Sequence, residues 1–490
     1  MHASNGPASA AKGPARAGAA AATGVPALSA EIFVIPLAPQ EPDRYLIYAP
    51  LRQAAFVTNA TVVNFMADLK QGVFDSACDP DGSLVEFLTR LEMIGAGPER
   101  MPITIPEGDP APTSVTLFLT TACNLRCTYC YASAGETPIR SMPISVARRG
   151  IDFVLDNAVR QGTSSIEIAY HGGGEPTLNW RTLTDSLAYA RDRARRHRVR
   201  VVASCATNGV LNDRQISWII ANLDGLSLSI DGLPEVHDQH RRLPSGKGSS
   251  DRVAHTLRRL DAAGFPYGLR LTVTADQIAT LPDSIEYLCA NFSATRIQVE
   301  PAYPLGRWAD APSAETTAFV SAYRMAQARA HSHGREIHYS AARVGHLTNH
   351  FCGVTQDAFA LSPDGNVSAC YEVFSEQSPW AGVFFYGRPD SGRSGYVFDR
   401  ARIGRLRRQA VQHRDYCRGC YARWTCAGDC LHRALNASDG REFRGTDRCH
   451  ITRELTRDQI LARIAAAGGV FWHEATPPKM PSASRSEVLP

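Results

Sequence analysis

Residues 120–132 read TTACNLRCTYCYA and place Cys123, Cys127 and Cys130 with three and then two residues between them. Three thiolates on one short loop can bind three irons of a four-iron, four-sulfur cluster and leave the fourth iron open to a cofactor. A structural zinc site needs four ligands, and no His or fourth Cys follows closely enough to complete one. A disulfide loop fits poorly, because the number of cysteines is odd. The spacing therefore favours a cluster with an open iron.

This spacing, with Tyr129 before the last cysteine, resembles the signature of the radical S-adenosylmethionine (SAM) enzymes. The resemblance implies that the open iron is chelated by the amino and carboxylate groups of SAM. It also implies that an electron from the cluster cleaves SAM to methionine and a 5'-deoxyadenosyl radical, which abstracts a substrate hydrogen. Cys123, Cys127 and Cys130 would then be the catalytic and metal-binding residues, and Tyr129 would lie at the cofactor site.

Length and composition narrow the class of protein. The 490 residues suggest about three domains, and 44% of them are hydrophobic, which is enough to form sizeable cores. No apolar run approaches the roughly 20 residues of a membrane span. A net charge of +4 is too mild to indicate nucleic acid. Thirteen cysteines in a long chain suggest metal binding rather than a secreted disulfide scaffold. We therefore expect a soluble, cytoplasmic protein with neither a membrane nor a nucleic acid as partner.

Changes in composition along the chain suggest six segments. Residues 1–30, rich in Ala, Gly and Pro, are expected to form a disordered tail. A Pro-rich linker at 106–114 separates a first folded module from the catalytic domain. The segments expected after the tail are a module at 31–105, the linker, a barrel at 115–340, a cysteine-rich domain at 341–455, and a helix with a second disordered tail at 456–490.

The module at 31–105 has the pattern of three short strands followed by two helices. The strands are predicted at 32–35, 45–48 and 55–57. The helices are predicted at 62–70, capped by Thr61, and at 84–94, closing at Gly95. The pattern resembles the winged-helix module that binds leader peptides in ribosomal peptide maturation. The alternative is a structural cap on the catalytic domain.

From residue 115 onward, apolar strands alternate with amphipathic helices. Such alternation implies parallel strands joined by right-handed crossovers, hence an α/β protein with a full or partial barrel. The resemblance to the radical SAM enzymes implies a partial (β/α)6 barrel of the TIM type. The strands are predicted at 115–119, 166–170, 199–204, 226–230, 269–273 and 297–299, and the helices at 146–159, 183–195, 253–263 and 285–292.

Each unusual motif follows one of these strands, on the rim where barrel enzymes place their chemistry. The resemblance implies that Gly173, Gly174 and Glu175 bind the amino group of SAM. It also implies that Asn208 contacts the ribose of SAM and that the Ser229 hydroxyl contacts its carboxylate. Away from such a rim, a Gly-Gly-Glu or Asn-Gly sequence is an ordinary turn. His237, Asp238 and Arg241 belong to a stretch similar to the peptide-modifying branch of the family, and a structural role is expected for them.

Seven downstream cysteines form a second signal. Their pattern is C-x12-G-x4-C, a gap, C-x2-C-x5-C-x3-C, a gap and a last C, and it resembles the SPASM extension, which carries two auxiliary [4Fe-4S] clusters. A zinc ribbon would use only one C-x2-C pair. The resemblance implies two ligand sets: Cys352, Cys370 and Cys430 for the first auxiliary cluster, and Cys417, Cys420, Cys426 and Cys449 for the second.

The first auxiliary cluster lacks a fourth cysteine, since residues 353–369 contain none. Its open iron could bind a substrate group, an electron-transfer partner or another ligand such as Asp357. The remaining cysteines, Cys78, Cys205 and Cys289, are expected to bind nothing, and the last two to be buried.

These observations together predict a radical SAM enzyme that uses SAM and three [4Fe-4S] clusters. Its expected substrate is a ribosomally made precursor peptide with a leader, its product a cross-link or another oxidative modification, and its reductant a flavodoxin or ferredoxin. A sulfatase-maturating enzyme is the alternative, although that branch has an Asp where this chain has Tyr371-Glu372. A second alternative is a non-catalytic iron-sulfur electron carrier. The presence of Glu175 and Asn208, which are expected to contact SAM, makes this alternative less favourable.

Overall fold

The computed structural model describes residues 27–28, 31–38, 41–136, 138–392, 394–438, 440 and 443–474. The disordered tails expected at the two ends fall largely outside these residues. The chain divides into two compact units, residues 1–99 and residues 100–490. The division therefore lies a few residues before the predicted linker.

The first unit contains an antiparallel meander, β1-β2-β3, followed by two helices. Each predicted strand and helix is present. The strands extend up to four residues beyond their predicted ends, and two predicted helix ends are wrong. Asn59 caps the first helix, because its Oδ1 accepts a hydrogen bond from the Val62 N–H at 3.2 Å, so Thr61 lies inside the first turn. The second helix ends early, because Glu92 has a left-handed φ of +56°. The elements are β1 (Phe33–Ala38), β2 (Glu41–Ala49), β3 (Ala54–Thr58), α1 (Ala60–Lys70) and α2 (Ser83–Arg90).

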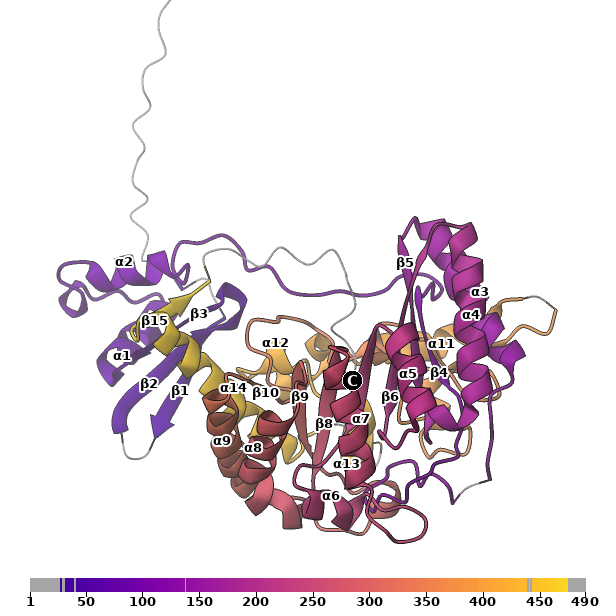
Figure 1. Cartoon of the computed structure of the whole chain (residues 1–490). Coiled ribbons are helices and arrows are strands. Elements are labelled where there is room, and N and C mark those ends of the chain that lie inside the picture. Colours follow the sequence, from indigo (N-terminus) through magenta and orange to yellow (C-terminus); the bar gives the residue numbers. More distant parts are fainter. Residues whose placement is uncertain are drawn as a thin grey trace, which may run out of the picture. The chain divides into compact units, whose positions relative to one another are not determined.

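Six parallel strands alternate with helices at the centre of the second unit, which confirms the predicted partial (β/α)6 barrel (Figure 1). Each observed strand begins and ends within three residues of its prediction. The strands are β4 (Ser114–Phe118), β5 (Ser165–His171), β6 (Arg200–Thr207), β7 (Gly225–Ser229), β8 (Tyr267–Val273) and β9 (Arg296–Pro301). The helices are α3 (Ile144–Gln161), α4 (Trp180–Arg196), α5 (Asp213–Asn222), α6 (Pro234–His240), α7 (Ser250–Ala262), α8 (Leu281–Asn291) and α9 (Thr316–Ser332).

The cysteine-rich region continues the same sheet. The short strand β11 pairs in parallel with β4, with Ala360 opposite Thr116, and β12 to β14 extend the sheet in antiparallel fashion. The remaining helices and strands of the second unit are β10 (Ile337–His338), β11 (Ala360–Leu361), β12 (Val367–Ser368), α10 (Ala381–Phe384), β13 (Phe385–Pro389), β14 (Tyr396–Phe398), α11 (Arg400–Arg407), α12 (Arg423–Cys426), α13 (Leu431–Ser438), α14 (Arg448–Ala466) and β15 (Phe471–His473).

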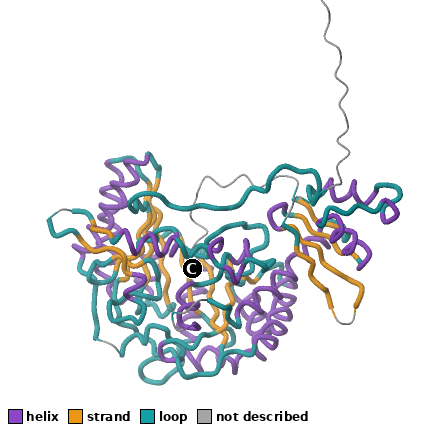
Figure 2. The backbone as a smooth tube through the Cα atoms, turned by 180° about the vertical axis from the view of Figure 1, so that it is seen from behind, coloured by secondary structure: helices purple, strands orange, loops and turns teal. Residues whose placement is uncertain are grey.

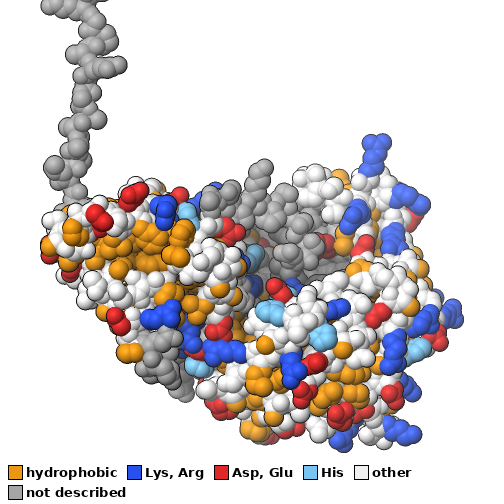
Figure 3. All heavy atoms as spheres, turned by 60° about the vertical axis from the view of Figure 1, so that its left-hand side comes forward, with side chains coloured by type: hydrophobic (Ala, Val, Ile, Leu, Met, Phe, Trp, Pro, Cys, Tyr) orange, Lys and Arg blue, Asp and Glu red, His pale blue; other side chains and the backbone are white. Residues whose placement is uncertain are grey.

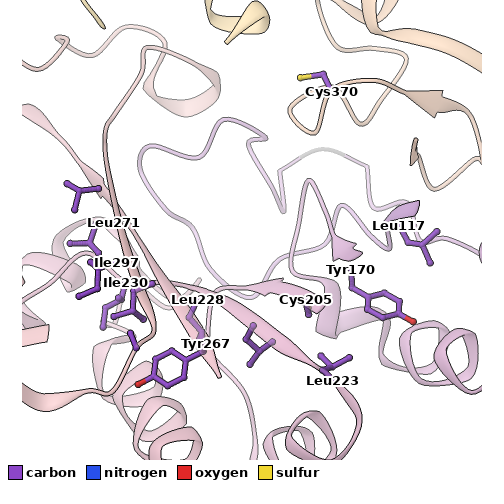
Figure 4. Close-up of a cluster of buried hydrophobic side chains, with 14 of the residues drawn as sticks. Leu117, Tyr170, Cys205, Leu223, Leu228, Ile230, Tyr267, Leu271, Ile297 and Cys370 are labelled. Carbon is purple, nitrogen blue, oxygen red and sulfur yellow. The ribbon is translucent and has the colours of Figure 1, made fainter. Parts of the chain in front are cut away.

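Apolar side chains from neighbouring strands form the core of the second unit. Leu228, Ile230, Tyr267, Leu271 and Ile297 lie together in Figure 4, and all are nearly fully buried. Helices run along the outside of the strands (Figure 2). Acidic and basic side chains are interspersed on the face shown in Figure 3. Among the described residues, every helix is too short or too polar to cross a membrane.

Candidate functional site

The cysteine loop follows β4 and is clamped from the far side of the barrel. The Arg307 guanidinium donates to the Cys127 carbonyl at 2.7 Å, and its backbone N–H donates to the Cys130 carbonyl at 3.1 Å. At Gly306 a Cβ would lie 2.3 Å from that same Cys130 carbonyl, so the chain approaches closely only because this residue is glycine. The backbone carrying the three sulfurs is therefore fixed by the fold.

The three thiols of this loop affect one another. Burial and the Glu175 carboxylate raise the pKa of the Cys123 thiol, which reaches about 12 with the further effect of Cys127 and Cys130. Such thiols ionise when a metal replaces the proton. Burial also raises the pKa of the Cys127 thiol. Three sulfurs held on one buried loop therefore fit the irons of a cluster.

The glycine-rich loop after β5 packs directly on the cysteine loop. The Gly174 N–H donates to the Thr120 carbonyl at 3.1 Å, and the Glu175 N–H donates to the Ala122 carbonyl at 2.8 Å. A Cβ at Gly174 would lie 2.0 Å from the Ala122 carbonyl oxygen. The two loops therefore form one unit whose spacing depends on Gly174 having no side chain.

Gly174→Ala is expected to displace the cysteine loop. The new methyl group would collide with backbone, which cannot rotate away, so we expect a loss of stability of about 1 to 3 kcal/mol and weaker SAM binding. Urea unfolding and equilibrium dialysis with SAM measure the two effects. Gly225→Ala is the control, since its Cβ would meet nothing closer than 3.8 Å among the described residues. Equal SAM affinity in both variants would contradict the close packing.

Both carboxylate oxygens of Glu175 accept hydrogen bonds from the protein. Oε1 accepts from the Thr177 hydroxyl at 2.7 Å and the Thr207 hydroxyl at 2.9 Å. Oε2 accepts from the Asn208 N–H at 2.8 Å. The side chain is buried, and burial raises the pKa of its carboxyl. Glu175 therefore fastens the glycine loop to the end of β6.

Asn208 lies beside the cysteine loop. Its side-chain amide donates to Asn124 Oδ1 at 2.7 Å and approaches Cys123 Sγ at 3.8 Å. Ser229 is half-buried at the end of β7, on the same rim. The structure thus brings both predicted cofactor contacts to the carboxyl ends of the strands, where the cysteines lie.

Tyr129 forms a buried triad with Asp231 and Arg241. The Tyr129 hydroxyl donates to Asp231 Oδ2 at 2.5 Å and accepts from Arg241 Nη1 at 2.9 Å. Burial by itself would lower the pKa of Arg241, but the negative groups around it, including the Cys127 thiolate, raise that pKa. Arg241, expected to be only structural, therefore also places a positive charge near the cysteine loop.

The downstream cysteines fall into two sets in space. Burial raises the pKa of the Cys370 thiol, and Glu372 raises it further. Cys430 and Cys352 have the same effect on Cys370, so these three sulfurs are neighbours. The grouping follows the fold, because the three cysteines come from distant parts of the sequence.

The second set gathers around α12 and the start of α14. Burial raises the pKa of Cys417 to about 11, and Cys420 and Cys449 contribute to the rise. Burial and Asp429 raise the pKa of the Cys426 thiol, and the same two cysteines raise it further. In the described part of the chain no three His, Cys, Asp or Glu side chains converge on a single metal ion. A four-iron cluster spaces its thiolates more widely than one ion does.

Comparison with known proteins identifies the family. The sequence profile described as radical SAM superfamily matches residues 117–287. Mycofactocin maturase MftC of Mycobacterium tuberculosis is 30% identical over 376 residues, which cover 73% of this chain and 88% of that protein. The chain belongs to the radical SAM superfamily. It is therefore an enzyme, as predicted.

Further similar proteins are consistent with this family assignment. The sporulation killing factor maturation protein SkfB of Bacillus subtilis is 26% identical over 271 residues, covering 53% of this chain and 60% of that protein. A solved structure described as native anSMEcpe with bound AdoMet has a TM-score of 0.58 at 17% identity, covering 73% of this chain and 100% of that one. At this identity the structural match shows the shared fold.

Tyr131 is a site residue of the radical SAM enzyme that sequence reasoning missed. Its hydroxyl donates to the Gly172 carbonyl at 3.3 Å. Burial raises its pKa, and Glu372, Cys130 and Cys370 raise it further. Tyr131 thus lies between the cysteine loop and the first downstream set. The signal was its position directly after Cys130.

His171, at the end of β5, is a second such residue. Its ring stacks on Tyr371, with centroids 5.7 Å apart, and its Nδ1 is buried without a hydrogen-bond partner among the described residues. Burial and the positive charge of Arg270 lower the pKa of His171 to about 4. The imidazole is therefore neutral at pH 7.

His171→Asn is expected to flatten the acid dependence of stability. The unfolded chain binds a proton as pH falls through about 6.5, but folded His171 stays neutral until about 4, so stability is lost across that window. Between pH 7.5 and 5.0 the wild type should lose about 2 kcal/mol more than the variant in urea unfolding. His255→Asn, at a side chain 51% exposed, is the control. A variant that parallels the wild type would contradict a neutral His171.

Glu372, two residues after Cys370, lies between a histidine and an arginine. Its Oε2 lies 2.7 Å from His432 Nδ1, and its Oε1 lies 3.9 Å from Arg433 Nη2. Burial alone would raise the pKa of Glu372, but these neighbours lower it. Asp357, considered as an iron ligand, instead forms an ion pair with Arg407, with Nε 2.9 Å from Oδ1.

The three remaining cysteines lie apart from both sets. Cys205 and Cys289 are buried, as expected, at 2% and 7% exposure. Cys78 is exposed, and its thiol donates to Asp75. All 13 cysteines are free of disulfides.

Proposed function

We propose that this radical SAM enzyme matures a ribosomally made precursor peptide. The clamped loop of Cys123, Cys127 and Cys130 at the carboxyl end of β4 is the observation that supports it most directly. Two relatives are named for maturation, of mycofactocin and of sporulation killing factor. Extending maturation to this chain gives a peptide as substrate and a cross-link or another oxidative change as product.

The cofactors follow from the donor set. Cys123, Cys127 and Cys130 would bind three irons of a [4Fe-4S] cluster and leave the fourth open to SAM. When bound, the reduced cluster and SAM supply a 5'-deoxyadenosyl radical that takes hydrogen from an unactivated carbon, which side chains alone cannot do. The chain itself binds the cofactor, excludes water and orients one C–H bond.

Residues of the rim would orient SAM. The backbone carbonyls near Gly173 and Gly174 are suited to its ammonium group, since Glu175 already accepts bonds from the protein. Asn208 would contact the ribose and Ser229 the carboxylate. Glu175 would act by holding the loop, and Tyr129 by joining the cysteine loop to Asp231.

Two auxiliary [4Fe-4S] clusters would complete the redox equipment of a SPASM region. Cys352, Cys370 and Cys430 would bind the first, and Cys417, Cys420, Cys426 and Cys449 the second. Glu372 would lie beside the first cluster, because it raises the pKa of all three of these thiols. Asp357 is a poor fourth ligand for this cluster, because its carboxylate already pairs with Arg407.

The meander and helices of the first unit would recognise a leader peptide. The strand β1 forms one edge of its sheet, and an edge strand offers backbone groups for an added strand. An external flavodoxin or ferredoxin would supply electrons. The cytoplasm is the compartment that suits 13 free cysteines.

One experiment tests the function. Anaerobically reconstituted protein, SAM and dithionite are incubated with the peptide encoded beside its gene, with and without the leader. We expect 5'-deoxyadenosine together with a change in peptide mass that requires the leader. A sulfatase peptide converted to formylglycine would instead establish the alternative. If no 5'-deoxyadenosine formed, the remaining interpretation would be a non-catalytic electron carrier.

A further inference from the structure

Positive charge is concentrated in one segment of the chain. Residues 400–463 contain 15 arginines, no lysine and 7 acidic residues, a net charge of +8, whereas the whole chain carries +4. The rest of the chain is therefore net negative. The basic segment is also the one that carries Cys417, Cys420, Cys426 and Cys449. Among the described residues, six of these arginines form ion pairs with acidic residues outside the segment, so only part of the positive excess is left to attract an anionic partner.

One side of this cysteine set lies close to the protein surface. Cys420 and Cys449 are half-buried, whereas Cys417 and Cys426 are buried. Tyr416, directly before the set, is 43% exposed, and the Arg418 side chain within it is 78% exposed. The path of an electron from the protein surface to these cysteines is therefore short.

Arginines surround the set. We name Arg414, Arg418, Arg423, Arg444 and Arg453 the arginine surface. The Cys417 N–H donates to the Arg414 carbonyl at 3.0 Å, and the Arg423 N–H donates to the Cys420 carbonyl at 3.0 Å. The Arg453 carbonyl accepts from the hydroxyl of Tyr421, which follows Cys420, at 2.6 Å.

The segment around Phe443 places Arg444 on the same surface. Phe443 packs edge-on against Tyr416, with ring centroids 5.5 Å apart. Arg414 lies over the Phe443 ring at 5.3 Å. Arg444 follows Phe443 and is exposed, so its charge lies beside the cysteine set.

We propose that the arginine surface docks an acidic one-electron carrier protein of the flavodoxin or [2Fe-2S] type. The reduced carrier loses one electron, the iron-sulfur site held by the four cysteines gains it, and no bond forms or breaks. The proposal rests on the proposed function, which assigns these cysteines to a cluster. The positive charge would also attract nucleic acid. The half-buried cluster ligands beside this charge favour an electron carrier, because only a carrier exchanges electrons with a cluster. Complementary charge raises the rate of encounter and makes it sensitive to salt.

The test reverses two charges in the full-length reconstituted enzyme. Arg418→Glu with Arg444→Glu is compared with Arg181→Glu with Arg195→Glu on α4. The control pair is well matched: Arg195 is 79% exposed and pairs with Asp192 three residues away, as Arg418 pairs with Asp415. An acidic flavodoxin and dithionite are the two electron sources, and titration calorimetry with oxidised flavodoxin measures docking directly.

At low ionic strength, flavodoxin-driven 5'-deoxyadenosine formation should fall at least about tenfold in the first variant only. Flavodoxin affinity should fall in parallel, and 0.5 M salt should remove the difference, because it shortens the reach of charge. The dithionite-driven rate should be unchanged. Equal flavodoxin affinity in both variants, or duplex DNA bound in its place, would overturn the proposal. A wild type that fails to cleave SAM with dithionite would instead overturn the proposed function, and the calorimetry would still decide the docking.

Discussion

Replacing Cys123, Cys127 and Cys130 together by alanine is expected to reduce 5'-deoxyadenosine formation to background. The three sulfurs are the only cysteines on the clamped loop, so the triple variant should lose the irons that SAM requires. We expect about four fewer irons per chain after anaerobic reconstitution. Iron analysis and chromatography of the SAM cleavage products measure both effects.

The control variant replaces the other three cysteines, Cys78, Cys205 and Cys289, by alanine. It removes the same number of thiols, one exposed and two buried, from positions outside all three sets. It should keep its full iron content and its SAM cleavage, with a modest loss of stability from the two core positions. If the two triple variants had the same iron content and activity, the assignment of the cofactor site would be wrong.

Arg448→Met is expected to destabilise the protein by about 3 to 5 kcal/mol. Arg448 is 2% exposed and holds two buried carboxylates: its Nη1 lies 2.7 Å from Glu300 Oε2 and its Nε lies 2.8 Å from Asp429 Oδ2. Although burial alone would raise the pKa of Glu300, Arg448 and Arg433 hold it at about 2. Losing Arg448 leaves two carboxylates in the interior with much less compensation. Urea unfolding of the metal-free protein measures the loss.

Two further variants make this prediction sharper. Arg195→Met removes an arginine whose side chain is 79% exposed and should change stability by well under about 1 kcal/mol. Adding Glu300→Gln and Asp429→Asn to Arg448→Met should recover most of the loss, since the buried charges are then gone. A triple variant no more stable than Arg448→Met would show that packing, rather than charge, accounts for the effect.

Much of the barrel could be predicted because its signals are local. Each strand is a short apolar run, and the strand ends were predicted to within three residues. The helix α5 was not predicted, although its capping box between Asn212 and Gln215 is visible in the sequence. The cap of α1 was assigned to Thr61 instead of Asn59, since both residue types cap helices and only the backbone geometry separates them.

The sequence by itself determined the spacing of Cys123, Cys127 and Cys130 and the order of the barrel elements, because both depend on neighbours along the chain. Only the tertiary structure decided what Glu175 does, since two of its donors come from Thr207 and Asn208, 32 and 33 residues away. The same holds for His171, Tyr131 and the buried Arg448 pairs, which depend on contacts with the cysteine-rich region. A hydrogen bond or an ion pair joins groups by their distance in space, and no spacing along the chain encodes that distance.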